Sequence, residues 1–168
     1  MKDVMIDIET LGTRSTSAIV QIGACYFNRE NGDIGRVFEM NIKVPRDMFT
    51  IDYSTIQWWL AQSPEAQQAI TLDPEPLALV IEELAAFLNE ATYIWSHATF
   101  DVPILLNTFD KLDRNFPIHY TKMRDIRTLM DITKHKSVAK RAGIHHTALD
   151  DCRYQVGYCV EALNKLKV

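Results

Sequence analysis

A nearly continuous hydrophobic run lies close to the start of the chain, where residues 2–10 read KDVMIDIET. Its apolar positions fall on both faces of an extended segment, which is typical of a central strand covered on both sides. Asp7 and Glu9 interrupt this run, and because side chains alternate along a strand, both emerge on the same face. Two desolvated carboxylates repel each other, so a divalent cation bound by both is the favoured interpretation. The structural alternative places one acid in solvent and the other in a salt bridge.

The next two segments also have the two-residue period of strands. Residues 18–27 are predicted to form the second strand, and residues 34–44 alternate between apolar and polar positions. Asn31-Gly32 lies between them and is a strong hairpin signal. Three antiparallel strands are therefore expected to open the domain.

After Pro45 the hydrophobic period changes to that of helices. Amphipathic helices are predicted for three segments: residues 52–60, a stretch that begins at Ser63-Pro64, and residues 77–88. Trp58 and Trp59 lie in the first of these helices. Tryptophans in a short amphipathic helix belong more often to the core than to a base-stacking surface, so packing is favoured and stacking stays open.

The second half of the chain alternates short strands with helices. Residues 93–95 are a short apolar strand that leads into SHATFD at residues 96–101. A helix begins there, because Pro103 is tolerated only in a first turn, and Asp101 lies at its start. The helix dipole favours the ionised carboxylate that a metal requires, although for Asp101 taken alone an ordinary helix cap is the preferred interpretation.

The remaining pattern predicts a weaker fifth strand and two further helices, at residues 118–123, 124–133 and from about residue 148 to 166. The whole pattern indicates an α/β fold, with a mixed five-stranded sheet flanked by helices, in a single domain over residues 1–168.

The last helix is preceded by a segment rich in candidate chemistry, GIHHTALDD at residues 143–151. Thr147 and Asp150 have the spacing of a capping box, which predicts Thr147 as the N-cap and Asp150 as its reciprocal partner. Asp151 then points about 100° away from Asp150 and is free to bind a metal. His146 precedes the cap, outside the helix, where an imidazole suits the role of a general base.

Composition limits the class of protein. With 168 residues, 47% hydrophobic and 24% charged, the chain is typical of one globular domain. No apolar run is long enough to cross a bilayer and no signal sequence precedes the first strand, so a cytoplasmic protein without a membrane partner is expected. The three cysteines have no CxxC spacing, which argues against a disulfide framework or a zinc site.

Charge is distributed unevenly. The net charge of −4 argues against a protein that coats duplex DNA by bulk electrostatics. Residues 122–141, however, contain seven basic side chains and only two acidic ones, a local excess of five positive charges. This segment is either a solvated surface or a site for nucleic-acid phosphates.

Three motifs together resemble a known family. They are Asp7-x-Glu9-Thr10, His97-x-x-Phe100-Asp101 and His146-x-Ala148-x-x-Asp151. In order, spacing and structural context they are similar to the three motifs of the DnaQ-like 3′–5′ exonucleases, in the DEDDh subgroup of the ribonuclease H-like superfamily. Further stretches look most like the small exonucleases of T-even phages and the related bacterial 3′–5′ exoribonucleases.

The resemblance implies two Mg²⁺ or Mn²⁺ ions and assigns a role to each motif residue. Asp7, Glu9, Asp101 and Asp151 would hold the metals, and His146 would be the general base. Thr10 and Leu11 would help to seat the terminal nucleotide. In the basic segment, Arg124, Arg127 and Lys136 are the candidates for phosphate contacts.

Two histidines stay open at this stage. Many members of the family carry asparagine where this chain has His97, which either contacts substrate or satisfies the strand end, the structural role being favoured. His145 is a rival to His146 as the base, but the spacing to Asp151 and the cap position favour His146.

The expected function is metal-dependent 3′–5′ exonucleolytic hydrolysis of single-stranded DNA or RNA with a free 3′ end, releasing 5′-mononucleotides. A non-catalytic nucleic-acid- or partner-binding module on the same fold is the alternative, and clustered acids facing phosphates argue against it. An endonuclease is a further option. The preferred sugar stays open, because a few loop hydrogen bonds read the 2′-hydroxyl. A homodimer also stays open, since some relatives dimerise.

Overall fold

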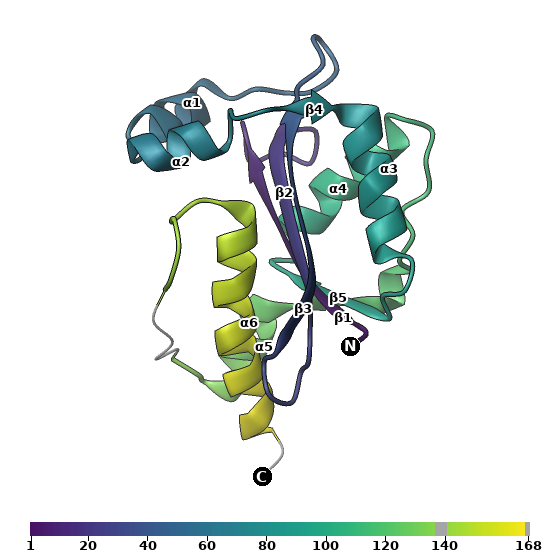
Figure 1. Cartoon of the computed structure of the whole chain (residues 1–168), viewed down its shortest axis with the longest axis vertical. Helices are drawn as coiled ribbons and strands as arrows, with labels where there is room; N and C mark the ends of the chain where they lie inside the picture. Colours follow the sequence, from purple (N-terminus) through teal and green to yellow (C-terminus); the bar gives the residue numbers. More distant parts are fainter. Residues whose placement is uncertain (137–140, 167–168) are drawn as a thin grey trace.

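A computed structural model describes residues 1–136 and 141–166 of the chain. At its centre is one mixed sheet of six strands in the order β4-β3-β2-β1-β5-β6 (Figure 1). The antiparallel strands are β1 (Asp3–Thr10), β2 (Ile19–Phe27) and β3 (Ile34–Lys43), and the parallel additions are β4 (Glu75–Pro76), β5 (Tyr93–Ser96) and β6 (Met123–Asp125).

The mixed α/β fold is confirmed, but the prediction of five strands and the place of the last one were wrong. The additional strand, β4, is only two residues long and contains a proline, so it leaves no periodic signal. The last strand begins at Met123, later than expected, because Tyr120–Lys122 form a short 3₁₀ turn. Ile118 is apolar for another reason: it packs into the core from the connection before that turn.

The helices cover both faces of the sheet. In Figure 1, α5 (Ile126–Thr133) and α6 (Ala148–Lys165) lie on one face, and α3 (Leu77–Leu88) and α4 (Asp101–Asp110) lie on the other. The short helices α1 (Tyr53–Leu60) and α2 (Pro64–Ala69) lie beyond one end of the sheet, above the start of α6. None of the helices in the described ranges is long and apolar enough to span a membrane.

Every residue of β1 is buried, as expected of a central strand. Val4, Ile6 and Ile8 belong to the hydrophobic core on the side of α3 and α4, whereas Met5 belongs to the core on the side of α5 and α6. The alternation therefore directs Asp7 and Glu9, at the end of the same strand, toward α6. The alternation along β1 therefore places two carboxylates beside the start of α6.

Gly23 allows α6 to come this close. It lies opposite Asp7 in the β1–β2 ladder, and a β-carbon at this position would overlap the backbone of Ala148 and Leu149. The missing side chain therefore lets the start of α6 lie directly against β2. This contact brings Asp151, in the first turn of the helix, next to Asp7.

Replacing Gly23 with alanine is expected to destabilise the protein by at least about 2–3 kcal/mol, because backbone has to move to accommodate the new methyl group. Urea unfolding measures the loss of free energy. Gly35→Ala is the matched control, since its β-carbon would come too close only to the flexible Met1 side chain, with the sulfur 2.8 Å away, and would be in ordinary contact with Tyr26. Equal stability of the two variants would contradict this account of the helix–strand contact.

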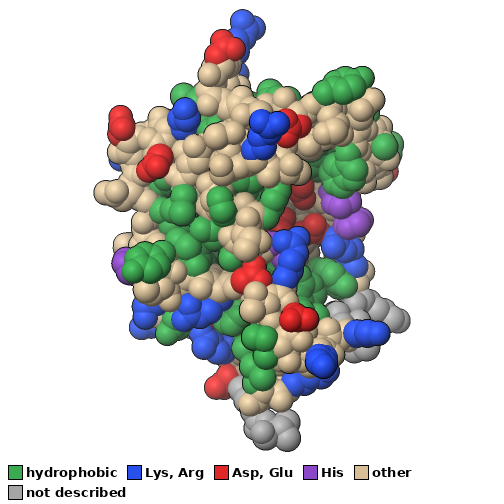
Figure 2. Space-filling model, turned by 180° about the vertical axis from the view of Figure 1, so that it is seen from behind, with side chains coloured by type: hydrophobic (Ala, Val, Ile, Leu, Met, Phe, Trp, Pro, Cys, Tyr) green, Lys and Arg blue, Asp and Glu red, His purple; other side chains and the backbone are tan. Residues whose placement is uncertain are grey.

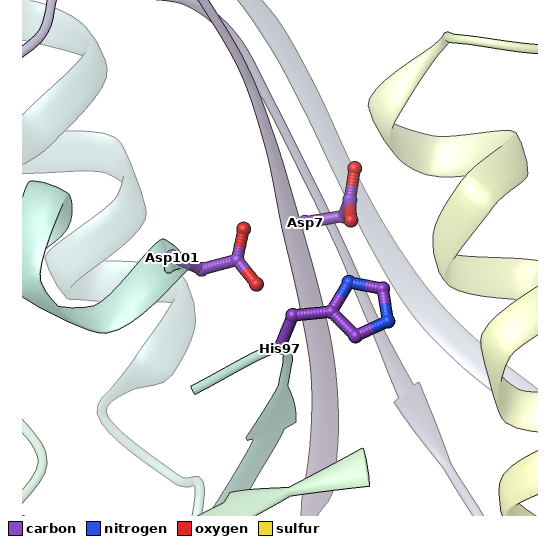
Figure 3. A group of neighbouring side chains, drawn as sticks. All are labelled: Asp7, His97 and Asp101. Carbon is purple, nitrogen blue, oxygen red and sulfur yellow. The ribbon is translucent and has the colours of Figure 1, made fainter. Parts of the chain in front are cut away.

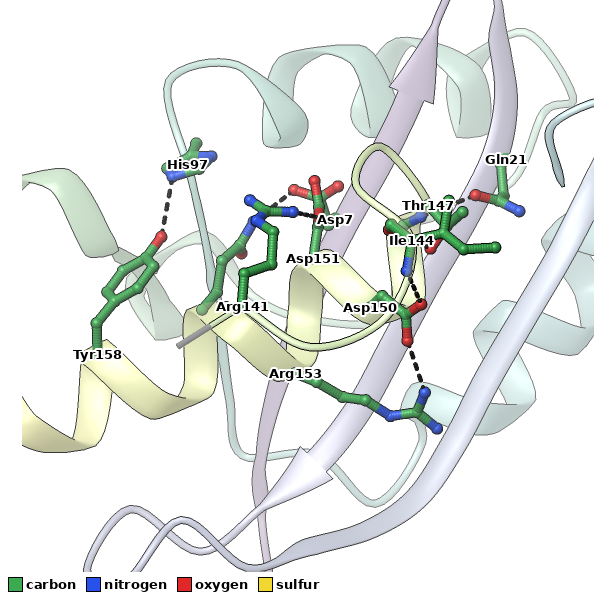
Figure 4. Close-up of polar contacts among 12 residues, drawn as sticks. Asp7, Gln21, His97, Arg141, Ile144, Thr147, Asp150, Asp151, Arg153 and Tyr158 are labelled. Atoms are coloured by element: carbon green, nitrogen blue, oxygen red, sulfur yellow. Dashed lines mark hydrogen bonds and ion pairs between the residues drawn. The ribbon is translucent and has the colours of Figure 1, made fainter. Parts of the chain in front are cut away.

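The start of α6 differs from the predicted capping box. Thr147 is the N-cap residue, but its side chain accepts no bond from the helix, and its hydroxyl donates to the carbonyl of Ile144 at 3.1 Å. The Ala148 N–H instead donates to Oε1 of Gln21 on β2, at 2.8 Å. Asp150 accepts from the Ile144 N–H at 2.9 Å and pairs with Arg153 at 2.8 Å (Figure 4). Gln21 on the adjacent strand therefore caps the helix. Asp150 instead stabilises the loop that precedes α6, through its bond from Ile144.

Candidate active site

Four carboxylates from three separate parts of the chain meet in one cavity. Asp7, Glu9, Asp101 and Asp151 all line a cavity of about 400 Å³, and each is more than nine-tenths buried. Figure 2 shows acidic side chains in a hollow beside histidines and a basic side chain. Volume alone does not distinguish this cavity, since another of about 430 Å³ lies against α3. The four buried carboxylates distinguish it from the other cavity.

The potential metal ligands fall into two groups. Ligand atoms of Asp7, His97 and Asp101 lie within 4.8 Å of one another, and those of Glu9, His146 and Asp151 form a second such group. Figure 3 shows the first group, with the side chains of β1, the end of β5 and the start of α4 directed to a common space. The structure therefore brings together all five residues that the motifs singled out as catalytic.

The turn between β5 and α4 holds Asp101 in place. The backbone carbonyl of His97 accepts from the N–H groups of Phe100 and Asp101, at 2.7 and 3.0 Å. Asp125, at the end of β6, accepts from the Ala98 N–H at 2.9 Å and also from Thr128 at 2.7 Å as the cap of α5. The same acid thus fixes the second motif and the start of a helix.

Burial disfavours the ionised form of Asp7, Glu9 and Asp101 and raises the pKa of each. Burial raises the pKa of Asp7 to about 7, although its hydrogen bond from Gln155 (2.7 Å) acts in the opposite direction. Burial and the charge of Asp7 raise the pKa of Glu9 to about 9 and also raise that of Asp101. Such clustering is expected where an external cation supplies the missing charge.

The residues present fit divalent metal ions. Oxygen donors from four carboxylates suit Mg²⁺ and Mn²⁺. Oδ2 of Asp101 is fully buried and has no hydrogen-bond partner among the described residues. An unpartnered buried carboxylate oxygen is costly, so a cation that binds it accounts for its placement.

His146 occupies a strained position at the edge of the cavity. Its backbone has φ of 64°, the left-handed region that a residue other than glycine rarely adopts. The ring stacks on His145, with centroids 3.7 Å apart, and packs edge-on against Trp58 at 4.6 Å. Burial, and then the neighbouring His145, lowers the pKa of His146 below its usual value, which favours the neutral imidazole.

The predicted substrate residues are dispersed. Arg127 lines the cavity, and Thr10 lines an adjoining pocket. Leu11 packs instead with the small hydrophobic cluster around Trp59. Arg124 stacks on Tyr93, 4.6 Å from the ring centroid, and donates to backbone carbonyls nearby, so it does not line the cavity. Lys136 is exposed and lies outside the cavity lining.

Sequence reasoning gave no site role to several residues of this cavity, among them Gln155 and Arg141, and favoured a core role for Trp58. Gln155 is one helical turn after Asp151 on the same face of α6, and this spacing was the available signal. Arg141 belongs to the basic segment but was not selected, and it pairs with Asp151 (Figure 4). Trp58 lines the cavity and is 43% exposed, whereas Trp59 is 5% exposed. The core assignment therefore applies to Trp59, and Trp58 faces the site.

Arg141 neutralises part of the acidic cluster. Its removal should therefore lower the stability of the metal-free protein and raise the affinity for Mn²⁺. Without metal, Arg141→Ala should lower the Tm by about 2–4 °C, because a partly buried ion pair is lost. The same variant should bind Mn²⁺ roughly tenfold more tightly, because a fixed cation no longer shares Asp151. Thermal melts in EDTA and calorimetric titration measure the two effects. Arg153→Ala is the control, since Arg153 pairs with Asp150 outside this cavity; unchanged Mn²⁺ affinity in Arg141→Ala would contradict the prediction.

The fold and this carboxylate cluster agree with one class of protein, the 3′–5′ exonucleases, which the match to a family model establishes. More particularly, the chain belongs to the 3′–5′ exoribonuclease Rv2179c-like domain family, whose model matches residues 2–163.

One relative resembles the chain in sequence, and two solved structures resemble it in fold. The exodeoxyribonuclease of Enterobacteria phage T4 is 27% identical, and the match covers 78% of this chain and 71% of the phage protein. The nuclease domain of 3′hExo, a DEDDh family member bound to rAMP, has a TM-score of 0.71 at 13% identity and covers 96% of this chain and 91% of that one. Pop2p of S. pombe, in an Mg²⁺- and Mn²⁺-bound form, has a TM-score of 0.65 at 14% identity and covers 95% and 82%.

Proposed function

We propose that this exonuclease removes nucleotides one at a time from the 3′ end of single-stranded DNA or RNA, using two divalent metal ions and His146 as the general base, and releases 5′-mononucleotides. One observation carries the proposal: two groups of potential ligands, each with a buried carboxylate pair, share one cavity that has His146 at its edge. The Mg²⁺- and Mn²⁺-bound form of Pop2p supports the choice of metals.

The metals would be held by Asp7, Glu9, Asp101 and Asp151. When bound, two such ions lower the pKa of water and neutralise the charge that develops on the phosphate. His146 accepts the proton of the attacking water. Its lowered pKa favours the neutral imidazole near neutral pH, which is the form that can accept a proton. Gln155 holds the orientation of the Asp7 carboxylate through its 2.7 Å hydrogen bond.

The terminal nucleotide would occupy a second pocket of about 390 Å³ that shares Glu9, Trp58 and Phe100 with the carboxylate cavity. Aromatic side chains at its walls suit a base or sugar. Thr10 is at its edge, where the hydroxyl donates to the Gly12 carbonyl at 2.7 Å and keeps the loop after β1 closed. Arg127 and Arg141 line the carboxylate cavity and are the proposed phosphate contacts.

Both DNA and RNA belong in the proposal. The family is described as exoribonuclease, whereas the T4 relative is an exodeoxyribonuclease.

A purely binding module gains nothing from carboxylates of raised pKa that face a phosphate chain, so catalysis is the better account of the cavity. The cytoplasmic location stays a prediction. Nothing in the described part of the chain supports a homodimer, which is left out of the proposal.

A time course with 5′-labelled single-stranded DNA and RNA of one sequence tests this function. With Mg²⁺ or Mn²⁺ we expect a ladder that shortens from the 3′ end, and EDTA should stop it. A 3′-blocked oligonucleotide should stay intact, whereas internal cuts would indicate an endonuclease. Absence of cleavage together with absence of divalent-ion binding would refute the enzymatic proposal.

A further inference from the structure

His97 is the unassigned member of the first ligand group. It follows directly after β5, and a ring nitrogen lies within 4.8 Å of carboxylate oxygens of both Asp7 and Asp101. Figure 3 shows its ring beside the two carboxylates, in the space toward which they point. The side chain is therefore placed as a member of the site, although the sequence alone favoured a structural role at the strand end.

The other side of the ring has its own partner. Nε2 of His97 lies 3.4 Å from the Tyr158 hydroxyl, which comes from α6 (Figure 4). A histidine that binds a metal through one nitrogen usually donates its other N–H to a neighbouring oxygen, which fixes the ring and its tautomer. If Nε2–H donates to Tyr158, the lone pair is on Nδ1. Burial and the charge of Arg127 lower the pKa of His97 to about 4, in agreement with a neutral ring.

We propose that His97 is a nitrogen ligand of the metal ion held by Asp7 and Asp101, oriented by Tyr158, and that it makes this position prefer Mn²⁺ over Mg²⁺. The inference rests on the proposed metal-dependent function and deepens it by naming a further ligand and the metal selected.

The physical reason for the preference is the chemistry of the donors. Mg²⁺ selects hard oxygen ligands in near-ideal octahedral geometry, and an imidazole nitrogen is a poorer donor to it. First-row transition metals accept imidazole readily. A site with two carboxylates and one imidazole therefore gains more affinity for Mn²⁺ than for Mg²⁺. Asparagine at the same position offers a carbonyl oxygen, which removes this difference.

The test combines calorimetry with pulsed electron paramagnetic resonance of bound Mn²⁺, which detects nitrogen-14 directly attached to the metal. The proteins are wild type, His97→Asn, Tyr158→Phe and His146→Asn, with His119→Asn as the matched control because His119 is exposed and absent from both ligand groups. With one equivalent of Mn²⁺, nitrogen coupling is expected in wild type, His146→Asn and His119→Asn, and its loss in His97→Asn.

For His97→Asn we expect the Kd for Mn²⁺ to rise at least about tenfold and the Kd for Mg²⁺ to change by less than about threefold. Tyr158→Phe should keep the nitrogen coupling and raise the Kd for Mn²⁺ severalfold, and this variant decides the matter if His97→Asn does not fold. Nitrogen coupling that persists in His97→Asn, or equal losses of Mn²⁺ and Mg²⁺ affinity, would overturn the proposal.

The same measurements separate this proposal from the proposed function. Oligonucleotide cleavage by wild type without nitrogen coupling would refute only the role of His97. Nitrogen coupling without cleavage would refute the proposed function and leave the ligand assignment standing.

Discussion

Replacement of Asp7 with asparagine is expected to lower the rate of 3′-end cleavage by about 10³-fold or more, equivalent to roughly 4 kcal/mol of transition-state stabilisation. Asp7 lies in the central strand, belongs to the first ligand group and carries a charge that acts on Glu9 and Asp101. Asparagine keeps an oxygen for the bond from Gln155 but removes the negative charge that binds a cation. Single-turnover cleavage of a labelled oligonucleotide at saturating Mn²⁺ measures the loss.

The same variant should be more stable than wild type in EDTA at pH 8. The pKa of Asp7 rises from 3.8 in the unfolded chain to about 7 in the fold, so the folded state prefers the protonated form. The associated stability is fully present below about pH 4 and is lost as the pH rises through 7. Asparagine resembles the protonated acid and escapes this loss, so its Tm should exceed that of wild type by several degrees at pH 8 and converge with it at pH 4.

Asp110→Asn is the control for both measurements, because Asp110 is exposed at the end of α4 and lies outside the cavity. It should change neither cleavage nor the pH dependence of the Tm. Loss of activity in Asp7→Asn accompanied by a lower Tm in EDTA would mean that Asp7 is a structural residue, which contradicts the site proposed here.

Replacement of His146 with alanine is expected to lower the rate of the chemical step by about 10²–10⁴-fold, the range for removal of a general base. The ring lies at the edge of the cavity, and its ligand atom is within 4.8 Å of those of Glu9 and Asp151. His145→Ala is the matched comparison, since it removes an exposed neighbouring imidazole and leaves His146 in place. It should cost less than about tenfold.

The pH profile separates a base from a residue that only packs. A general base acts in its neutral form, so the rate of wild type should fall as the pH drops through the pKa of His146, which burial and His145 place below 6.5. This acidic limb should disappear in His146→Ala and move to slightly higher pH in His145→Ala, which loses the neighbouring charge. An unchanged acidic limb in His146→Ala would assign the base to another group.

The sequence by itself determined those parts of the protein that depend on local periodicity. Alternation along β1 was sufficient to place Asp7 and Glu9 on one face, and the cap position was sufficient to place Thr147 at the start of α6. The proline in the first turn of α4 placed Asp101 at a helix start. The three motifs then indicated the family, which the match over residues 2–163 confirms. Within each element and each motif, these signals act between residues close together in the chain.

Only the tertiary structure decided which groups meet across long distances in the sequence. Gln21 caps a helix 127 residues later, and Gln155 donates to Asp7 from 148 residues away. Such bonds exist because Gly23 lets α6 approach β2, and nothing in the local pattern distinguishes this glycine from one that merely permits a turn. The placement of His97 beside Asp7 likewise depends on the pairing of β5 with β1. Packing between distant segments, rather than local preference, therefore decides the composition of the site.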